Sequence, residues 1–251
     1  MKRLKEQIAL WAAVWIGGVS AMLRKRLYWS VDERLLLVPG QPEQIALLVI
    51  TAGMVLFLLL QVYRQKGTGK FGDNFTCPGP EAIGHFLLAA GILATAVTRA
   101  PKMGGVLGLL WQLLGYLTPV CLTAAGIARL RKQRPHFLLH MVVCLYFVFH
   151  VVNQFRAWSG TPQMMDYLFD LFGSIGLILF AYYQTAFDID TGKRRPMLYW
   201  GYLGIFLCLV ELARSEFPLV YMGGVFWLTG CLASMTHGAA LEAEGERHDP
   251  A

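Results

Sequence analysis

Long stretches without a formally charged side chain constrain the fold of this chain most. Residues 44–63, 103–128 and 135–155 contain no Asp, Glu, Lys or Arg. About 20 helical residues cross a hydrocarbon core of about 30 Å, so each stretch is long enough to span a membrane. A spanning segment must satisfy its backbone hydrogen bonds internally, and these stretches are too long and continuous for barrel strands. We therefore predict transmembrane helices.

Eight apolar segments of this kind divide the chain. The segments between them are short, so no soluble domain fits there. The sequence predicts an all-α polytopic transmembrane helix bundle with about eight spans, forming one domain over 1–236. A short polar tail at 237–251 follows, which we expect to be cytoplasmic and disordered. The predicted spans are 7–23, 43–63, 81–99, 104–128, 136–155, 163–187, 197–213 and 216–236.

The composition excludes several classes of protein. Hydrophobic residues make up 56% of the chain and charged residues 15%, whereas soluble domains carry about 25% charged residues. This composition is incompatible with a typical soluble enzyme or a nucleic-acid-binding domain, and the lipid bilayer is the expected partner. Five cysteines in 251 residues are too sparse for a disulfide-stapled secreted domain.

Basic residues near the helix ends predict the orientation. With eight spans, fourteen of the 22 Lys and Arg residues fall on the face that carries both termini. Cytoplasmic segments are enriched in these residues, so we predict a cell-membrane protein with both termini in the cytoplasm. The basic cluster Arg24, Lys25 and Arg26 lies on the other face, against the rule. A cleaved signal peptide ending near Ala21, which would leave seven spans, remains an alternative.

Polar residues inside the predicted helices form two stripes. On the helix over 136–155, His136, His140, His150 and Gln154 fall within about 80° of one another at 100° per residue. The helix over 163–187 and its end carry a matching face. Ionisable side chains inside a membrane are costly and are functional candidates. The residues of that face are Asp166, Asp170, Gly173, Ser174, Leu177, Ala181, Gln184 and Asp188.

The ends of three consecutive helices bring several of these residues to one membrane face. Short connections make the helices over 136–155, 163–187 and 197–213 neighbours. We therefore predict an outward-facing polar pocket, with Glu216 in the turn that follows. The alternative is a solvated structural cluster whose charged groups reach interfacial water. The residues predicted to bind a ligand or ion are His150, Asn153, Gln154, Arg156, Asp166, Asp170, Glu211 and Arg214.

The histidines do not predict a haem. His140 and His150 are about 15 Å apart along one helix, so they cannot ligate one iron axially. His85 and His237 lie near the membrane face of His140, but no second histidine pair accompanies them. We predict no cofactor and no metal. No set of nucleophile and base or of metal ligands is apparent, which favours a non-enzymatic role without deciding it.

Two functions remain open at this stage. The first is transport or sensing of a small solute or ion through the pocket. The second is a non-catalytic scaffold or assembly factor that docks a membrane protein partner, through the basic segments 129–134 or 192–195. A stripe of small residues at Ala13, Gly17 and Ala21 favours close helix packing within the chain over dimerisation.

Overall fold

The structure is a computed structural model that describes residues 2–27, 41–63, 65, 69–99, 105–158 and 167–248. Side chains at 2–6, 157–158 and 236–248 lie outside this description. The described ranges contain eight long helices, one short helix and no strand. These are α1 (Lys2–Leu27), α2 (Pro42–Tyr63), α3 (Phe71–Asn74), α4 (Pro78–Thr98), α5 (Gly105–Leu130), α6 (Phe137–Trp158), α7 (Leu168–Asp188), α8 (Arg194–Leu212) and α9 (Pro218–His248).

The predicted all-α transmembrane bundle is confirmed. Each long helix coincides with one of the eight predicted spans, and seven of them are long and apolar enough to cross a membrane. The exception is α8, which carries Arg194, Arg195 and Glu211 and packs among α1, α2, α7 and α9. A helix enclosed by other helices needs no lipid-facing apolar surface. By the composition of its helices, the chain is a multi-pass membrane protein.

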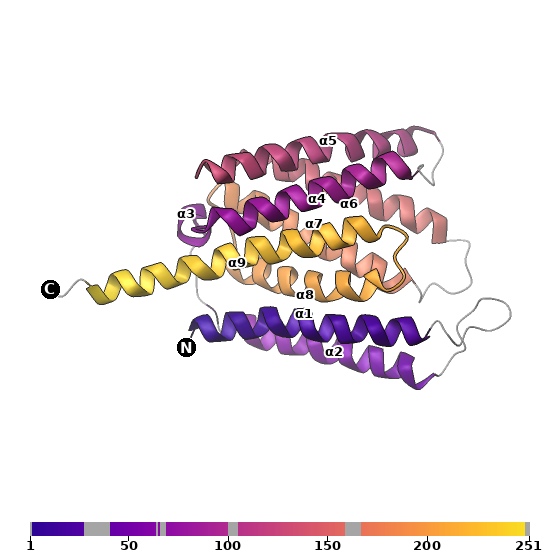
Figure 1. Ribbon diagram of the computed structural model, residues 1–251, viewed down its shortest axis with the longest axis horizontal. Coiled ribbons are helices and arrows are strands. Elements are labelled where there is room, and N and C mark those ends of the chain that lie inside the picture. The colour runs from indigo at the N-terminus through magenta and orange to yellow at the C-terminus, as the bar shows by residue number, and fades with distance from the viewer. Residues whose placement is uncertain are drawn as a thin grey trace.

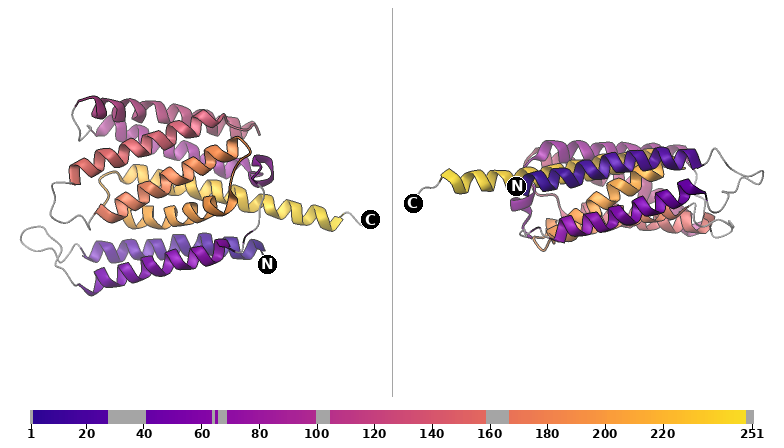
Figure 2. Two further views of the ribbon diagram at one scale, coloured as in Figure 1. Left: turned by 180° about the vertical axis from the view of Figure 1, so that it is seen from behind. Right: turned by 90° about the horizontal axis from the view of Figure 1, so that it is seen from below.

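The long helices form two layers that run along the same axis. In Figure 1, α4, α9 and α1 lie towards the viewer, and the view from behind in Figure 2 shows α6, α7 and α8. Helix α5 contacts both α4 and α6 at one edge, and α2 contacts α1 and α8 at the other. Leucines and valines on α2 are exposed, including Val49 and Leu60, as expected for a helix that faces lipid at the edge of a bundle.

Both ends of the helical chain lie at the same end of the bundle. Helix α1 begins and α9 ends on the side where the short helix α3 is found (Figure 1). This agrees with the predicted even number of crossings, while the cytoplasmic location of that end stays a prediction. Helix α9 continues past the predicted span end at 236 to His248, and the disorder of the tail likewise stays a prediction.

Glycines allow α4 and α9 to approach each other closely. A Cβ atom added at Gly84 would lie 2.8 Å from the Cα atom of Trp227, and one at Gly223 would lie 2.8 Å from the Cα atom of Leu88. Seven residues separate Gly84 from Gly91, and seven separate Gly223 from Gly230, so each pair lies on one face of its helix. A Cβ atom at Gly91 or Gly230 would collide with a backbone carbonyl of the opposite helix.

The small residues of α1 also pack inside the chain, as predicted. Ala13 is fully buried. A Cβ atom at Gly17 would lie 3.0 Å from the Cδ1 atom of Leu209 on α8. This stripe of α1 therefore meets α8, and α1 is an integral part of the bundle.

The glycine contacts lead to a first prediction. Gly91→Ala is expected to lower the free energy of unfolding by about 1–3 kcal/mol, because the added methyl group forces α4 and α9 apart. The matched control is Gly53→Ala on α2, where nothing lies within 4 Å of the added atom. Unfolding of the purified full chain in mixed micelles with increasing sodium dodecyl sulfate measures both variants. Equal stability of the two variants would contradict the close α4–α9 crossing.

Candidate functional site

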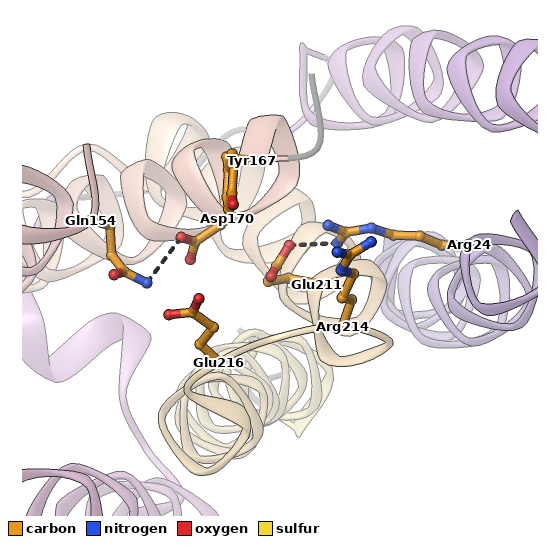
Figure 3. Close-up of a pocket in the computed structure, with 7 residues that line it drawn as sticks. All are labelled: Arg24, Gln154, Tyr167, Asp170, Glu211, Arg214 and Glu216. Atoms are coloured by element: carbon orange, nitrogen blue, oxygen red, sulfur yellow. Dashed lines mark hydrogen bonds and ion pairs between the residues drawn. The ribbon is translucent and has the colours of Figure 1, made fainter. Parts of the chain in front are cut away.

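A polar pocket lies at the end of the bundle opposite α3, where α1, α6 and α8 end and α7 begins (Figure 3). Its cavity measures about 70 Å³. A water molecule needs at least about 10–15 Å³ on this measure, so the cavity has room for a few waters or one small ion. The lining residues are Arg24, Gln154, Tyr167, Asp170, Glu211, Arg214 and Glu216.

Asp170 is held at the base of this pocket by hydroxyl and amide donors. The Tyr221 hydroxyl donates to its carboxylate, and the Gln154 Nε2 atom donates to its Oδ2 atom at 3.4 Å. The Ser174 hydroxyl lies 2.8 Å from that of Tyr221. Because the single proton of Tyr221 is donated to Asp170, Ser174 is the donor to Tyr221. The Gln154 Oε1 atom is buried and accepts no hydrogen bond from the described residues.

Glu211 on α8 is paired with an arginine from the far end of the sequence. The Arg24 Nη1 atom lies 2.5 Å from the Glu211 Oε2 atom and 3.1 Å from the Val210 carbonyl oxygen. Both side chains are almost completely buried. The Arg24 guanidinium also lies over the Phe169 ring, 5.1 Å from its centroid. This contact explains why a basic residue stands on the face where the positive-inside rule disfavours it.

The structure divides the predicted pocket residues into four groups. His150 and Asn153 are buried but do not line the cavity; His150 packs against Phe217 with ring centroids 4.9 Å apart. Arg156 is exposed and is not a lining residue. Asp166 lies outside the described residues. Four of the eight predicted residues line the cavity: Gln154, Asp170, Glu211 and Arg214.

Sequence reasoning missed two of the lining residues and named a third only as a neighbour. Arg24 and Tyr167 were not predicted, and Glu216 was placed in the adjoining turn. A usable signal existed for Arg24, because a basic residue on the unfavoured face is a candidate for an ion pair inside the bundle. Tyr167 directly precedes α7, and nothing in the residue pattern singles it out.

A second polar cluster is buried at the other end of the bundle, where α4 begins and α7 ends. The Arg129 Nε atom donates to the Glu81 Oε2 atom at 2.7 Å. Beside this ion pair, the His140 Nδ1 atom lies 2.6 Å from the Asp188 Oδ2 atom. The Nε2 atoms of His140 and His85 are 2.9 Å apart. All five side chains are buried, so α4, α5, α6 and α7 are joined here by polar contacts.

One part of this cluster has the spacing of a metal site. Ligand atoms of Glu81, His85 and Cys231 lie within 4.8 Å of one another. However, the Glu81 carboxylate is paired with Arg129, whose positive charge opposes a cation. The two ring nitrogens of His85 are engaged with the Glu81 carbonyl and with His140. We therefore assign no metal to these residues.

The segment 69–77, which contains α3 and which we call the α3 cap, covers this end of the bundle. Its backbone is held by Phe71 N–H, which donates to Asp190 Oδ1 at 2.9 Å, and by the Phe75 carbonyl, which accepts from Arg129 Nη2 at 2.8 Å. The Phe75 ring packs edge-on against Phe187 of α7. The α3 cap thereby closes the buried polar cluster off from the membrane surface.

The exposed residue Asp190 connects the α3 cap to the loop after α7. The Phe71 N–H donates to its carboxylate, and Arg134 forms an ion pair with it. The backbone hydrogen bond from Phe71 and the Arg134 guanidinium together hold the pKa of the Asp190 carboxyl below its usual range. The ionised form of Asp190 is thus the form that ties down the cap.

Comparison with known proteins adds no assignment. No protein family, no curated protein and no solved structure matches this chain. The geometry of the two polar clusters is therefore the basis for the functional argument.

The buried ion pair leads to a second prediction. Arg129→Gln is expected to destabilise the protein by about 3–5 kcal/mol, because it leaves the Glu81 carboxylate charged and unpaired inside the bundle. The double variant Glu81→Gln with Arg129→Gln is expected to recover part of this loss. Arg134→Gln is the control, since its side chain is 46% exposed. Thermal unfolding of the purified chain in detergent measures all three, and an Arg129 variant as stable as the control contradicts the prediction.

The pKa of Asp190 leads to a third prediction. The pKa of Asp190 in the folded state lies below its unfolded value of about 3.9. The contact of ionised Asp190 with Phe71 and Arg134 therefore stabilises the α3 cap fully above the unfolded pKa. It is lost as the pH falls through the lower folded pKa. The backbone amides of residues 69–77 should therefore lose protection from hydrogen exchange in that acid range, after correction for intrinsic exchange rates. Asp190→Asn keeps an acceptor for the Phe71 amide but does not titrate, so its protection should not change there. The same acid-induced loss in both proteins would show that another group is responsible.

Proposed function

We propose that the protein binds a small cation in the pocket at the end of α6, α7 and α8, and that it transports or senses this ion. The supporting observation is the oxygen-rich lining around Asp170. Carboxylate and amide oxygens are the groups that hard cations and protonated amines favour. Gln154 also lines the cavity and is joined to Asp170 by the hydrogen bond from its Nε2 atom.

The charge of the lining favours a cation over an anion. Three carboxylates and two guanidinium groups surround the cavity, which gives a formal charge of −1 when all are ionised. Arg24 is committed to Glu211 by the short ion pair. Figure 3 shows the Arg214 guanidinium beside Glu211 and Arg24, on the side of Glu211 away from the carboxylates of Asp170 and Glu216.

The size of the cavity limits the ligand further. A cavity of about 70 Å³ is far smaller than the sites of about 300–1,000 Å³ that bind drug-sized ligands. It suits an alkali metal ion with part of its hydration shell, ammonium, or a small protonated amine. The predicted orientation places this pocket on the outer face of the membrane, because most basic residues lie at the opposite end.

Four of the seven basic residues in the segments that suggested a scaffold make contacts within the chain, while Arg131, Lys132 and Lys193 are exposed. Arg129 pairs with Glu81, and Arg134 pairs with Asp190. Arg194 donates to Asn74 at 2.6 Å, and Arg195 donates to the Gln65 carbonyl at 2.5 Å. These arginines stabilise the end of the bundle within the chain itself, so we favour the ion-binding role.

A thermal-shift experiment tests the proposal, and its result is our fourth prediction. Sodium, potassium, ammonium and methylammonium chloride are compared at equal ionic strength with the bulky cation N-methylglucamine. We expect at least one small cation to raise the melting temperature of the purified full chain by several degrees, because binding to the folded state alone stabilises it. Asp170→Asn should abolish the shift.

Two further variants make the result interpretable. Glu216→Gln neutralises an exposed lining carboxylate, so it should weaken the shift. Asp190→Asn removes an exposed carboxylate at the opposite end and should respond like the wild type. The proposal would be overturned if no small cation raised the melting temperature above that in N-methylglucamine. It would also be overturned if the rise were unchanged in both Asp170→Asn and Glu216→Gln.

A further inference from the structure

The buried residues His85, His140 and Asp188 form a continuous hydrogen-bonded chain, which we call the His–His–Asp chain. It runs from the Glu81 carbonyl oxygen to His85 Nδ1 at 2.7 Å, and from His85 Nε2 to His140 Nε2 at 2.9 Å. It ends with His140 Nδ1 and Asp188 Oδ2, which are 2.6 Å apart. No part of the proposed cation pocket belongs to this chain.

The partners of His85 determine where its hydrogen lies. A backbone carbonyl accepts hydrogen bonds and does not donate them, so the Nδ1 atom of His85 carries a hydrogen. The indole Nε1 of Trp227 is a donor and lies 3.3 Å from His85 Nε2, so this nitrogen is an acceptor. His85 is therefore the neutral tautomer with its hydrogen on Nδ1.

The same reasoning assigns the proton between the two rings. The shorter contact, 2.9 Å between the two Nε2 atoms, needs a hydrogen. Since His85 Nε2 carries none, His140 Nε2 donates to it, and the longer contact from Trp227 shares the same lone pair. The remaining contact joins His140 Nδ1 to the Asp188 carboxyl group, and it also needs a hydrogen. Either His140 is doubly protonated beside an ionised Asp188, or His140 is neutral beside a protonated Asp188. Both arrangements contain one proton more than two neutral histidines and a carboxylate.

We propose that His85, His140 and Asp188 form a binding site for a single dissociable proton, and that this proton holds α4 against α6 and α7. The ligand and the place in the fold both differ from those of the cation pocket, so this inference goes beyond the proposed function.

Loss of the proton would change the contacts between these helices. Without it, each histidine keeps its hydrogen on Nδ1, for the Glu81 carbonyl and the Asp188 carboxylate respectively. The two Nε2 lone pairs would then face each other across 2.9 Å, with no hydrogen between them. His85 Nε2 would still accept from Trp227 Nε1, but His140 Nε2 would be a buried acceptor without a donor, which is unfavourable. One ring must then move, and the contact between His85 and His140 must weaken.

The other groups around the His–His–Asp chain do not supply the extra proton. The Glu81 carboxylate on α4 is neutralised by Arg129 on α5. Gln184 on α7 and Ser234 on α9 donate to that carboxylate at 3.4 Å. Cys231 on α9 is also buried beside Glu81 and His85. These neighbours are neutral or paired, so the charge within the His–His–Asp chain must balance internally.

Asp188 also has an oxygen available for a further proton or water contact. Its Oδ1 atom is buried and has no hydrogen-bond partner among the described residues. Asp188 is the last residue of α7, and Asp190 follows two residues later at the α3 cap.

Nitrogen-15 spectroscopy of histidine-labelled full chain, purified into lipid nanodiscs, tests the proposal and gives our fifth prediction. In the wild type, His85 should show a hydrogen on Nδ1 and His140 a hydrogen on Nε2. As the pH rises, the signals of both rings should change in one shared transition, since a single proton leaves. Assignment of the signals uses His85→Gln and His140→Gln.

Asp188→Asn is the decisive variant. Its amide can donate to His140 Nδ1, which satisfies every hydrogen bond with two neutral histidines and removes the need for the extra proton. The shared transition should therefore be lost, while Asp188→Glu should retain it and Asp190→Asn should match the wild type. A transition that persists in Asp188→Asn, or two wild-type rings that titrate independently, would overturn the proposal. These readouts require no cation binding, so they are independent of the pocket.

Discussion

Glu81 and Glu211 lie inside the helix bundle, and each is paired with an arginine from another helix. Arg129 of α5 holds Glu81 of α4, while Arg24 of α1 holds Glu211 of α8. A buried carboxylate without such a partner would be strongly destabilising. Apolar contacts alone distinguish poorly between helix arrangements in a membrane, because lipid tails are as apolar as leucine. The two ion pairs, at opposite ends of the bundle, therefore specify which helices meet.

Helix α7 connects the two polar ends. Asp170 lies in its first turn and Asp188 is its last residue, which places them about 27 Å apart along the helix. Between them, the buried face of α7 carries Leu177, Phe180 and Ala181. The middle of this helix face is thus apolar, and the polar pocket and the His–His–Asp chain are separate clusters at the two ends of one helix.

The sequence alone predicted the helices and much of the pocket, because both depend on local patterns. Hydropathy located the eight long helices, and helical periodicity placed Gln154 and Asp170 on inward faces. The pairing of Glu81 with Arg129 was not predictable in this way. Glu81 stood at the first position of a predicted span and Arg129 just after the end of another, so nothing in the residue pattern placed either side chain inside the bundle. The α3 cap has only four helical residues, too few to show a period.

The polar stripes explain why one site was predicted and the other was not. The predicted stripes already contained His140, Gln184 and Asp188. However, a pocket was predicted only from the stripe residues at the other end, where short loops make three consecutive helices neighbours. The second cluster needs His85 from α4, which is separated from His140 by 55 residues, and no loop length reveals that contact. Because α7 supplies Asp170 to the pocket and Asp188 to the proton site, a rigid displacement of α7 would alter both at once.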